Sequence, residues 1–190
     1  MPSALIVSAG EKGQAALRDM LSASRFDRVT TVSNGSDARR ALISQGYELV
    51  VINTPLTDEF GHELAAHASA GGAGVIMLCK AEHAEQLGAA LEREGVFVMS
   101  KPLVRPLFMQ ALHLVEMTQA RMYELIVERD KLRRQLEDLR AVSRAKCLLI
   151  ERLGWTEEKA HRHIEKQAMD LRISRAEVAR SILINYAGAN

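Results

Sequence analysis

Five short apolar runs, separated by stretches with helical spacing, constrain the fold of the first hundred residues more than any other feature. The runs cover residues 4–7, 29–32, 49–52, 75–79 and 96–99. Strands that are apolar on both faces occur mainly in parallel sheets covered by helices on both sides. The alternation therefore predicts an α/β fold, with a five-stranded parallel sheet doubly wound in the flavodoxin-like order.

One of the helical segments carries its own boundary signals. Ser36 is a favourable N-cap residue and Gly46 is a favourable helix stop. Ser36 can therefore cap the helix between the second and third apolar runs, and Gly46 can end it.

From Pro106 onward the pattern changes to one long helical segment. Proline is favoured in the first turn of a helix, and neither proline nor glycine follows before Gly154. At about 1.5 Å per residue, a helix over 106–153 would extend roughly 70 Å. Apolar residues recur in it at heptad positions a and d, although Arg129 occupies one a position.

The heptad pattern predicts a coiled coil that joins two copies of the chain. The alternative is one long helix that caps the sheet and leaves its outer end exposed, but several leucines would then face water. The predicted dimer seam consists of Val115, Met122, Leu125, Leu132, Leu136 and Leu139.

After Gly154 the sequence predicts two short helices, the first capped by Thr156 and the second opened by the capping box Ser174–Glu177. Neither can bury its apolar face alone, so we expect them to pack on the end of the long helix as a three-helix module. The expected core of this module includes Ala145, Met169 and Leu171. The predicted boundaries are 1–105 for the sheet domain, 106–142 for the coiled coil and 143–190 for the module.

Charge is balanced over the whole chain but not over its end. The net charge is +1, yet residues 140–190 hold ten arginines and lysines against six acidic residues. Any attraction to a nucleic acid must therefore be local to this part of the chain. A solvated helix face would give the same composition.

The first hundred residues resemble the receiver domain of two-component response regulators, a CheY-like fold. The resemblance rests on LIVSAG, YELVVINTPLTDEFG, VIMLCK and SKP, and it covers roughly residues 4–120. A working receiver places an acidic pair after the first strand and a phosphate-accepting aspartate after the third. It also has a hydroxyl residue after the fourth strand and a lysine after the fifth. The carboxylates hold Mg²⁺, and the aspartate is the nucleophile.

This chain departs from that pattern at most positions. The acidic pair falls on Ser8 and Ala9, the acceptor on Asn53, and the hydroxyl residue on Cys79, so that only Lys101 remains. The resemblance therefore implies a pseudo-receiver that neither binds a metal ion nor accepts a phosphoryl group. The nearby carboxylates Glu11, Asp58 and Glu59 are the residues that could replace the missing groups.

Residues 140–187 resemble the ANTAR domain, the RNA-binding output domain of bacterial antitermination regulators. The resemblance rests on AKCLLIERLGWTEEKAHRHIEKQAMDLRISRAEVARSIL, which has the expected spacing and length. It implies that RNA is the partner, and specific RNA readers usually target unpaired loop bases. The candidate RNA-binding residues are Arg144, Lys146, Arg172, Arg175 and His163, with His161 as a further candidate for stacking on a base.

A pseudo-receiver, a coiled coil and an ANTAR module in this order resemble the amidase-operon type of antiterminator, which implies control by a sensor or inhibitor protein rather than by phosphate. We expect a cytoplasmic homodimer that binds a hairpin in a leader RNA. The alternatives are a dimeric adaptor without nucleic-acid binding and, less favoured, a DNA-binding regulator.

No enzymatic activity, cofactor, metal or membrane segment is expected. The sequence contains no G-x-G-x-x-G, P-loop or Ser-His-Asp pattern, and no apolar run of about 18 residues. His161 and His163 are two apart on a helix and do not share a face. The two cysteines, Cys79 and Cys147, suit a reduced cytosolic protein.

Overall fold

A computed structural model describes residues 2–22 and 24–187 of the chain. The chain forms two compact units, Met1–Met122 and Tyr123–Asn190.

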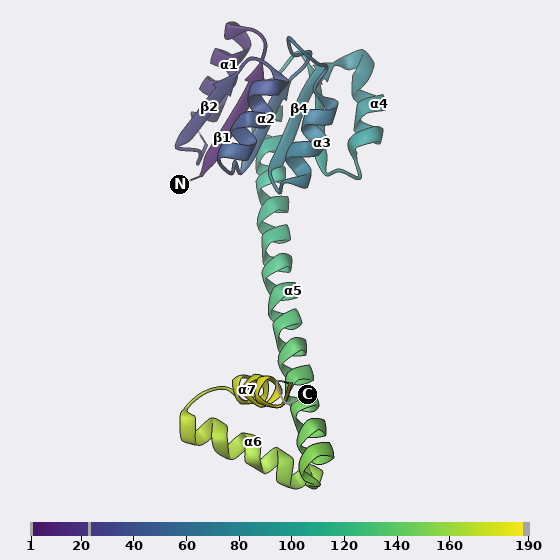
Figure 1. Ribbon diagram of the computed structural model, residues 1–190. Helices are drawn as coiled ribbons and strands as arrows, with labels where there is room; N and C mark the ends of the chain where they lie inside the picture. Colours follow the sequence, from purple (N-terminus) through teal and green to yellow (C-terminus); the bar gives the residue numbers. More distant parts are fainter. Residues whose placement is uncertain (1, 23, 188–190) are drawn as a thin grey trace. The chain divides into compact units, whose positions relative to one another are not determined.

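The first unit contains a five-stranded parallel sheet in the order β2-β1-β3-β4-β5 (Figure 1). This confirms the predicted doubly wound fold, and each predicted run lies inside a strand that extends it by at most two residues at either end. The strands are β1 (Ser3–Ser8), β2 (Arg28–Val32), β3 (Leu49–Asn53), β4 (Gly74–Lys80) and β5 (Val96–Lys101).

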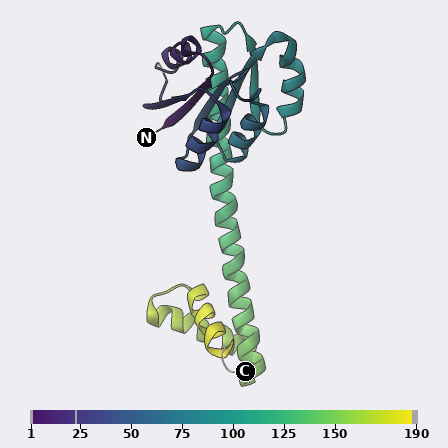
Figure 2. The same ribbon diagram turned by 45° about the horizontal axis from the view of Figure 1, so that its top comes forward.

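Helices cover both faces of the sheet. The helices of this unit are α1 (Glu11–Leu21), α2 (Gly35–Ser44), α3 (His62–Ala70), α4 (Ala81–Leu91) and the first part of α5 (Arg105–Leu153). Helices α2, α3 and α4 cover one face, whereas α1 and α5 cover the other, as the two views in Figures 1 and 2 agree.

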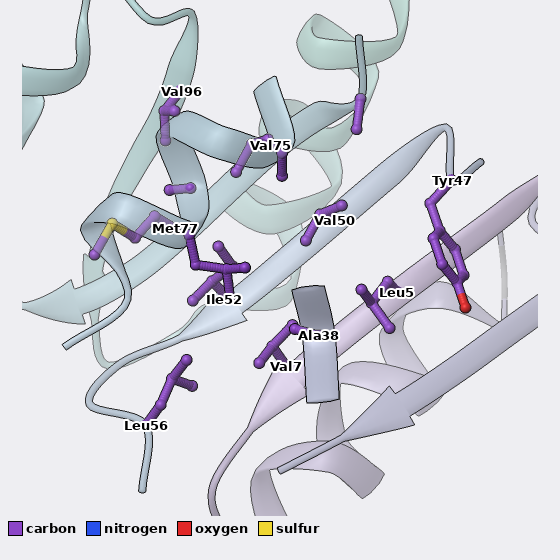
Figure 3. Packing of buried hydrophobic residues seen from close by; sticks show 14 of the residues in the cluster. Leu5, Val7, Ala38, Tyr47, Val50, Ile52, Leu56, Val75, Met77 and Val96 are labelled. Carbon is purple, nitrogen blue, oxygen red and sulfur yellow. The ribbon is translucent and has the colours of Figure 1, made fainter. Parts of the chain in front are cut away.

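Two apolar cores form because successive residues of a strand point to opposite faces of the sheet. Leu5 and Val7 of β1 belong to the core under α2 and α3, which Figure 3 shows from close by. Ala4 and Ile6 belong to the core under α1 and α5, where Phe108 is completely buried. The central strands β1, β3 and β4 are buried and largely apolar on both faces because each face has its own cover.

Helix α2 begins differently from the prediction. Asn34 is its N-cap, with the side-chain oxygen accepting a hydrogen bond from the backbone N–H of Asp37 at 2.7 Å, and Gln45 is its C-cap. The prediction that Ser36 caps the helix was therefore wrong, whereas Gly46 directly follows the C-cap. Asparagine caps a helix as well as serine does, and the Ser36 hydroxyl instead donates to the Asp58 carboxylate at 2.9 Å.

Helix α5 is continuous from Arg105 to Leu153. Pro106 lies in its first turn, and Gly154 follows its last residue with a φ of +65°. Glycine adopts this left-handed conformation at no steric cost, which explains why the helix stops there. None of the described helices is both long and apolar enough to be a candidate membrane span.

The second unit packs α6 (Glu157–Leu171) and α7 (Arg175–Ala187) against the end of α5. Its buried core is Ala145, Leu149, Ala160, Ile164, Ala168, Val178, Ala179 and Ile182. The three-helix arrangement agrees with the prediction, and so does the burial of Ala145.

Met169 and Leu171 are not core residues, contrary to the prediction. Their side chains are 73% and 62% exposed. Met169 follows the inward-facing Ala168 by one residue, which turns its side chain by about 100° around the helix. Leu171 is the last residue of α6, where the chain turns away through Arg172.

Candidate functional site

The carboxyl ends of the parallel strands bring Ser8 and Asn53 together. The two residues are partners in the register of β1 and β3. The Asn53 amide donates a hydrogen bond from Nδ2 to Ser8 Oγ at 2.9 Å. Ser8 is completely buried and Asn53 is half-buried, so this neutral pair fills the place where a receiver keeps its carboxylates.

Helix α1 lies directly against the Ser8–Asn53 pair. A Cβ atom at Gly13 would lie 2.6 Å from Ser8 Oγ and 2.7 Å from Asn53 Nδ2, closer than real side-chain contacts allow. Only a glycine lets the helix approach this closely. The backbone of α1 therefore closes the space next to the pair.

Lys101 lies at the end of β5 and donates a hydrogen bond from Nζ to the backbone carbonyl of Thr54. Burial lowers the pKa of Lys101. Its partner is thus the residue after Asn53 and not the Asn53 side chain. Cys79, at the end of β4, is buried, and burial raises the pKa of its thiol, which contacts the carbonyl of Met99 at 3.8 Å.

Two of the three nearby carboxylates have structural partners. Asp58 accepts hydrogen bonds from the backbone N–H groups of Gly35 at 2.8 Å and Ser36 at 3.0 Å, at the start of α2. The Gly35 bond, followed by the Ser36 bond, lowers the pKa of Asp58 to about 2. Glu59 binds Arg39 through two hydrogen bonds of 2.6 and 2.9 Å. Glu11 is exposed in the first turn of α1.

These residues do not fit a Mg²⁺ site. Mg²⁺ prefers carboxylate ligands, and neutral side chains stand in their place at the strand ends. Among the described residues no group of three His, Cys, Asp or Glu side chains could hold a metal ion.

In the second unit the structure separates the RNA-binding candidates into three kinds. Arg144 and Arg172 are exposed, and their side chains make no ion pair or hydrogen bond within the described part of the chain. Lys146 forms an ion pair with Glu157 at 2.9 Å, and Arg175 forms one with Glu165 at 3.2 Å.

His163 is the third kind, because its ring packs edge-on against Trp155 with the ring centroids 5.0 Å apart. His161 instead lies 3.2 Å from Glu165. The Lys146 hydrogen bond lowers the pKa of Glu157. Sequence reasoning missed Glu157 and Glu165 as partners, although the spacing of four between His161 and Glu165 pointed to a contact along α6.

Arg172 has an unusual backbone conformation. It is the C-cap of α6, with φ of 57° and ψ of 41°, in the left-handed region that glycine usually fills. Among the described residues other than glycine, Arg172 alone has a positive φ. A left-handed arginine costs stability, and such outliers cluster at functional sites.

The predicted dimer seam is exposed on α5 from Met122 onward. Met122, Leu125, Leu132 and Leu136 are each about half exposed, and Leu139 is 70% exposed. Val115 is different, because it is 9% exposed and packs in the core of the first unit against Gly74. The exposed stripe therefore begins one heptad later than the predicted seam.

Comparisons with known proteins agree with this architecture. Residues 130–183 match the ANTAR domain. The Aliphatic amidase regulator of Pseudomonas aeruginosa is 27% identical over 146 residues, which cover 74% of this chain and 72% of that protein.

Solved receiver domains share the fold. The signal receiver domain of an HD domain-containing protein from Pseudomonas fluorescens Pf-5 has a TM-score of 0.57 at 23% identity, covering 65% of this chain and 92% of that one. A response regulator receiver domain protein from Clostridium thermocellum has a TM-score of 0.55 at 13% identity, covering 66% and 99%. The chain therefore joins a domain of the receiver fold to a region that matches the ANTAR domain, and it is similar to the aliphatic amidase regulator.

Proposed function

We propose that the protein is a transcription antitermination regulator. It binds hairpins in a nascent leader RNA, in the cytoplasm, through its ANTAR domain, and a partner protein controls it instead of phosphorylation. The match of residues 130–183 to the ANTAR domain is the observation that carries this proposal.

The exposed cations support RNA as the ligand. Arg144 on α5 and Arg172 at the end of α6 have no acidic partner in the described part of the chain, so both guanidinium groups are available to phosphates. Lys146 and Arg175 contribute once a phosphate replaces Glu157 or Glu165 as their partner. His163 supports the Trp155 ring and acts as a positioning residue.

The residues at the strand ends of the first unit support a receiver that does not accept a phosphoryl group. A phosphoryl acceptor must be a nucleophile, and the Asn53 amide is not one. The carboxylates that would hold Mg²⁺ are replaced by Ser8 and Ala9, and α1 closes on the pair at Gly13. Asp58 and Glu59 already bind α2 residues, so they do not substitute for the acceptor.

The exposed stripe on α5 supports a homodimer. Five apolar side chains of one heptad register face outward from Met122 to Leu139, and a second copy of α5 would bury them. In this proposal the receiver covers residues 1–105, the dimerisation helix 106–142 and the RNA-binding domain 143–190.

A controlling partner protein is proposed because phosphorylation does not switch this receiver. A regulator with a fixed receiver needs another input, and binding of a sensor or inhibitor protein is the input that requires no chemistry at the strand ends. The partner acts by favouring one state of the regulator, which requires different affinities for the two states.

Filter binding tests the proposal. A library of RNA hairpins with a common stem and randomised loops is compared with duplex DNA of equal length across a salt series. We expect preference for certain hairpins, and lower affinity for Arg144→Ala and Arg172→Ala, each of which reduces the salt slope by about one. Arg134→Ala on α5, whose guanidinium bonds to its own helix backbone, is the control. A dimer that binds neither nucleic acid would instead be an adaptor, and equal binding to RNA and DNA would also reject the proposal.

A further inference from the structure

A groove crosses the second unit between α5, α6 and the start of α7. Its volume is 670 Å³, within the roughly 300–1,000 Å³ typical of small-molecule sites. All of its lining residues lie between Gln135 and Ala176, inside the region that matches the ANTAR domain.

The lining combines apolar and cationic side chains. Leu139, Val142 and Ala176 form an apolar part, and Lys146, His161 and Arg175 supply ring and cationic nitrogens. An apolar surface beside cations matches the two halves of a nucleotide, because a base has apolar faces and its phosphate is an anion.

Two polar side chains in the groove are available to a ligand. Gln135 and Ser143 line it, and neither side chain hydrogen-bonds to another residue in the described part of the chain. The amide of Gln135 and the hydroxyl of Ser143 each donate and accept hydrogen bonds, as base edges require. The carboxylate in the lining, Asp138, is already paired with Arg180.

Lys146, Arg175 and the ring of His161 have exchangeable partners. Glu165 contacts both His161 and Arg175, at 3.2 Å each, and Glu157 contacts Lys146 at 2.9 Å. The Glu157 side chain is largely exposed and that of Glu165 is 42% exposed, and ion pairs at a surface contribute little stability. A phosphate can therefore take the place of Glu165 with little loss.

We infer that this groove receives one unpaired loop nucleotide of the RNA. The base lies against Val142 and Ala176, beside the proposed dimer seam that buries Leu139, and its phosphate lies at His161 and Arg175. The inference rests on the proposed RNA-binding function, to which it adds the position of a nucleotide site. It places Gln135 and Ser143 as the residues that read the base edge.

The test fills the groove without changing its charge. Ser143→Trp places a large side chain in the lining, whereas Ser181→Trp makes the same change at an exposed position of α7 outside it. The full chain and both variants are titrated with the tightest hairpin from the library and with versions carrying one abasic loop position each. We expect Ser143→Trp to bind about 5- to 100-fold more weakly, the loss that removal of one base contact produces, with Ser181→Trp unchanged.

The abasic series identifies the nucleotide. Removing the base at one loop position should weaken binding by the parent protein about 5- to 100-fold. The same abasic hairpin should cause no further loss of affinity in Ser143→Trp. Because Ser143 also lies on an a position of the heptad register, His161→Trp fills the groove from α6, away from that seam. His161→Ala, which removes the same imidazole and leaves the groove open, separates filling from loss of the phosphate contact. Both variants must keep the sedimentation mass of the parent.

Three results would overturn the inference. These are a flat abasic series, tight binding by both groove-filling variants, or loss of the parent mass in both, which would make the groove an interface between copies. If the parent binds hairpins but no abasic position lowers its affinity, the nucleotide site in the groove is rejected and the proposed function stands. If the parent binds no hairpin at all, the proposed function is rejected.

Discussion

The Asn53 amide donates its hydrogen bond to the hydroxyl of Ser8, 2.9 Å away, across neighbouring parallel strands. In a phosphorylated receiver these two places carry charge, and the pair here is neutral on both sides. A buried charge without a metal or an ion-pair partner would be costly. The hydrogen bond satisfies both side chains without either.

The first prediction follows from this pair. Asn53→Asp should not restore phosphorylation, because the metal-binding carboxylates are still missing and Gly13 of α1 still lies on the site. Parent and variant are incubated with acetyl phosphate and Mg²⁺ and weighed by mass spectrometry. A stoichiometric mass increase of one phosphoryl group in the single variant would show that the acceptor alone limits the chemistry.

The second prediction concerns Arg172. Arg172→Gly should raise the stability of the second unit by about 0.5–1 kcal/mol, because glycine relieves the left-handed conformation. Arg172→Ala keeps the strained backbone and should not gain stability. Both variants should lose hairpin affinity. Denaturation is followed by fluorescence of Trp155, the only tryptophan of the chain, which lies in this unit.

If Arg172→Gly is more stable and binds RNA as tightly as the parent, the arginine has no role in binding. A loss of stability would mean that its backbone is not strained in solution.

The third prediction concerns the exposed stripe of α5. Replacing both Leu132 and Leu139 with Asp should dissociate the proposed dimer, because each carboxylate would enter an apolar seam. Both leucines are more than half exposed in the single chain, so its fold should survive. Tyr123→Asp with Val127→Asp is the matched control, since these exposed apolar residues lie outside the a and d positions. Sedimentation at several concentrations decides, and a dimer that persists in the leucine variant would place the interface elsewhere.

The fourth prediction concerns acid stability. Because hydrogen bonds from the start of α2 lower the pKa of Asp58 to about 2, from an ordinary value near 3.8, the carboxylate stabilises the fold above about pH 4. This contribution is lost as the pH falls from about 4 through 2. Asp58→Asn should therefore be less stable than the parent at pH 7, and the difference should shrink toward pH 2. Chemical denaturation followed by circular dichroism measures it, and a difference independent of pH would contradict the assigned cause.

Sequence reasoning predicted the sheet because its strands are buried runs whose periodicity is strong. It misplaced the start of α2 because Asn34 and Ser36 are both good caps, and the structure places Ser36 against Asp58 instead. It placed Met169 in the core, whereas only the packing of α6 reveals which residues face inward.

The candidate site was predicted as a set of residue types but not as a set of contacts. The sequence motifs alone show that Ser8 and Asn53 stand where a working receiver has carboxylates. Their hydrogen bond, and the contacts of Lys146 and Arg175 with glutamates of α6, depend on how the helices meet. The groove was missed for the same reason, because its lining comes from three helices.

The two thiols of the protein differ in accessibility, since Cys79 is buried and Cys147 is exposed on α5. A maleimide-linked spin label should therefore react with Cys147 alone in the folded protein. If two copies of α5 pair in parallel, the labels lie on neighbouring helices whose axes are about 8–10 Å apart. Antiparallel pairing would place them at opposite ends of the seam, so a single electron-spin distance reports the direction in which the paired helices run.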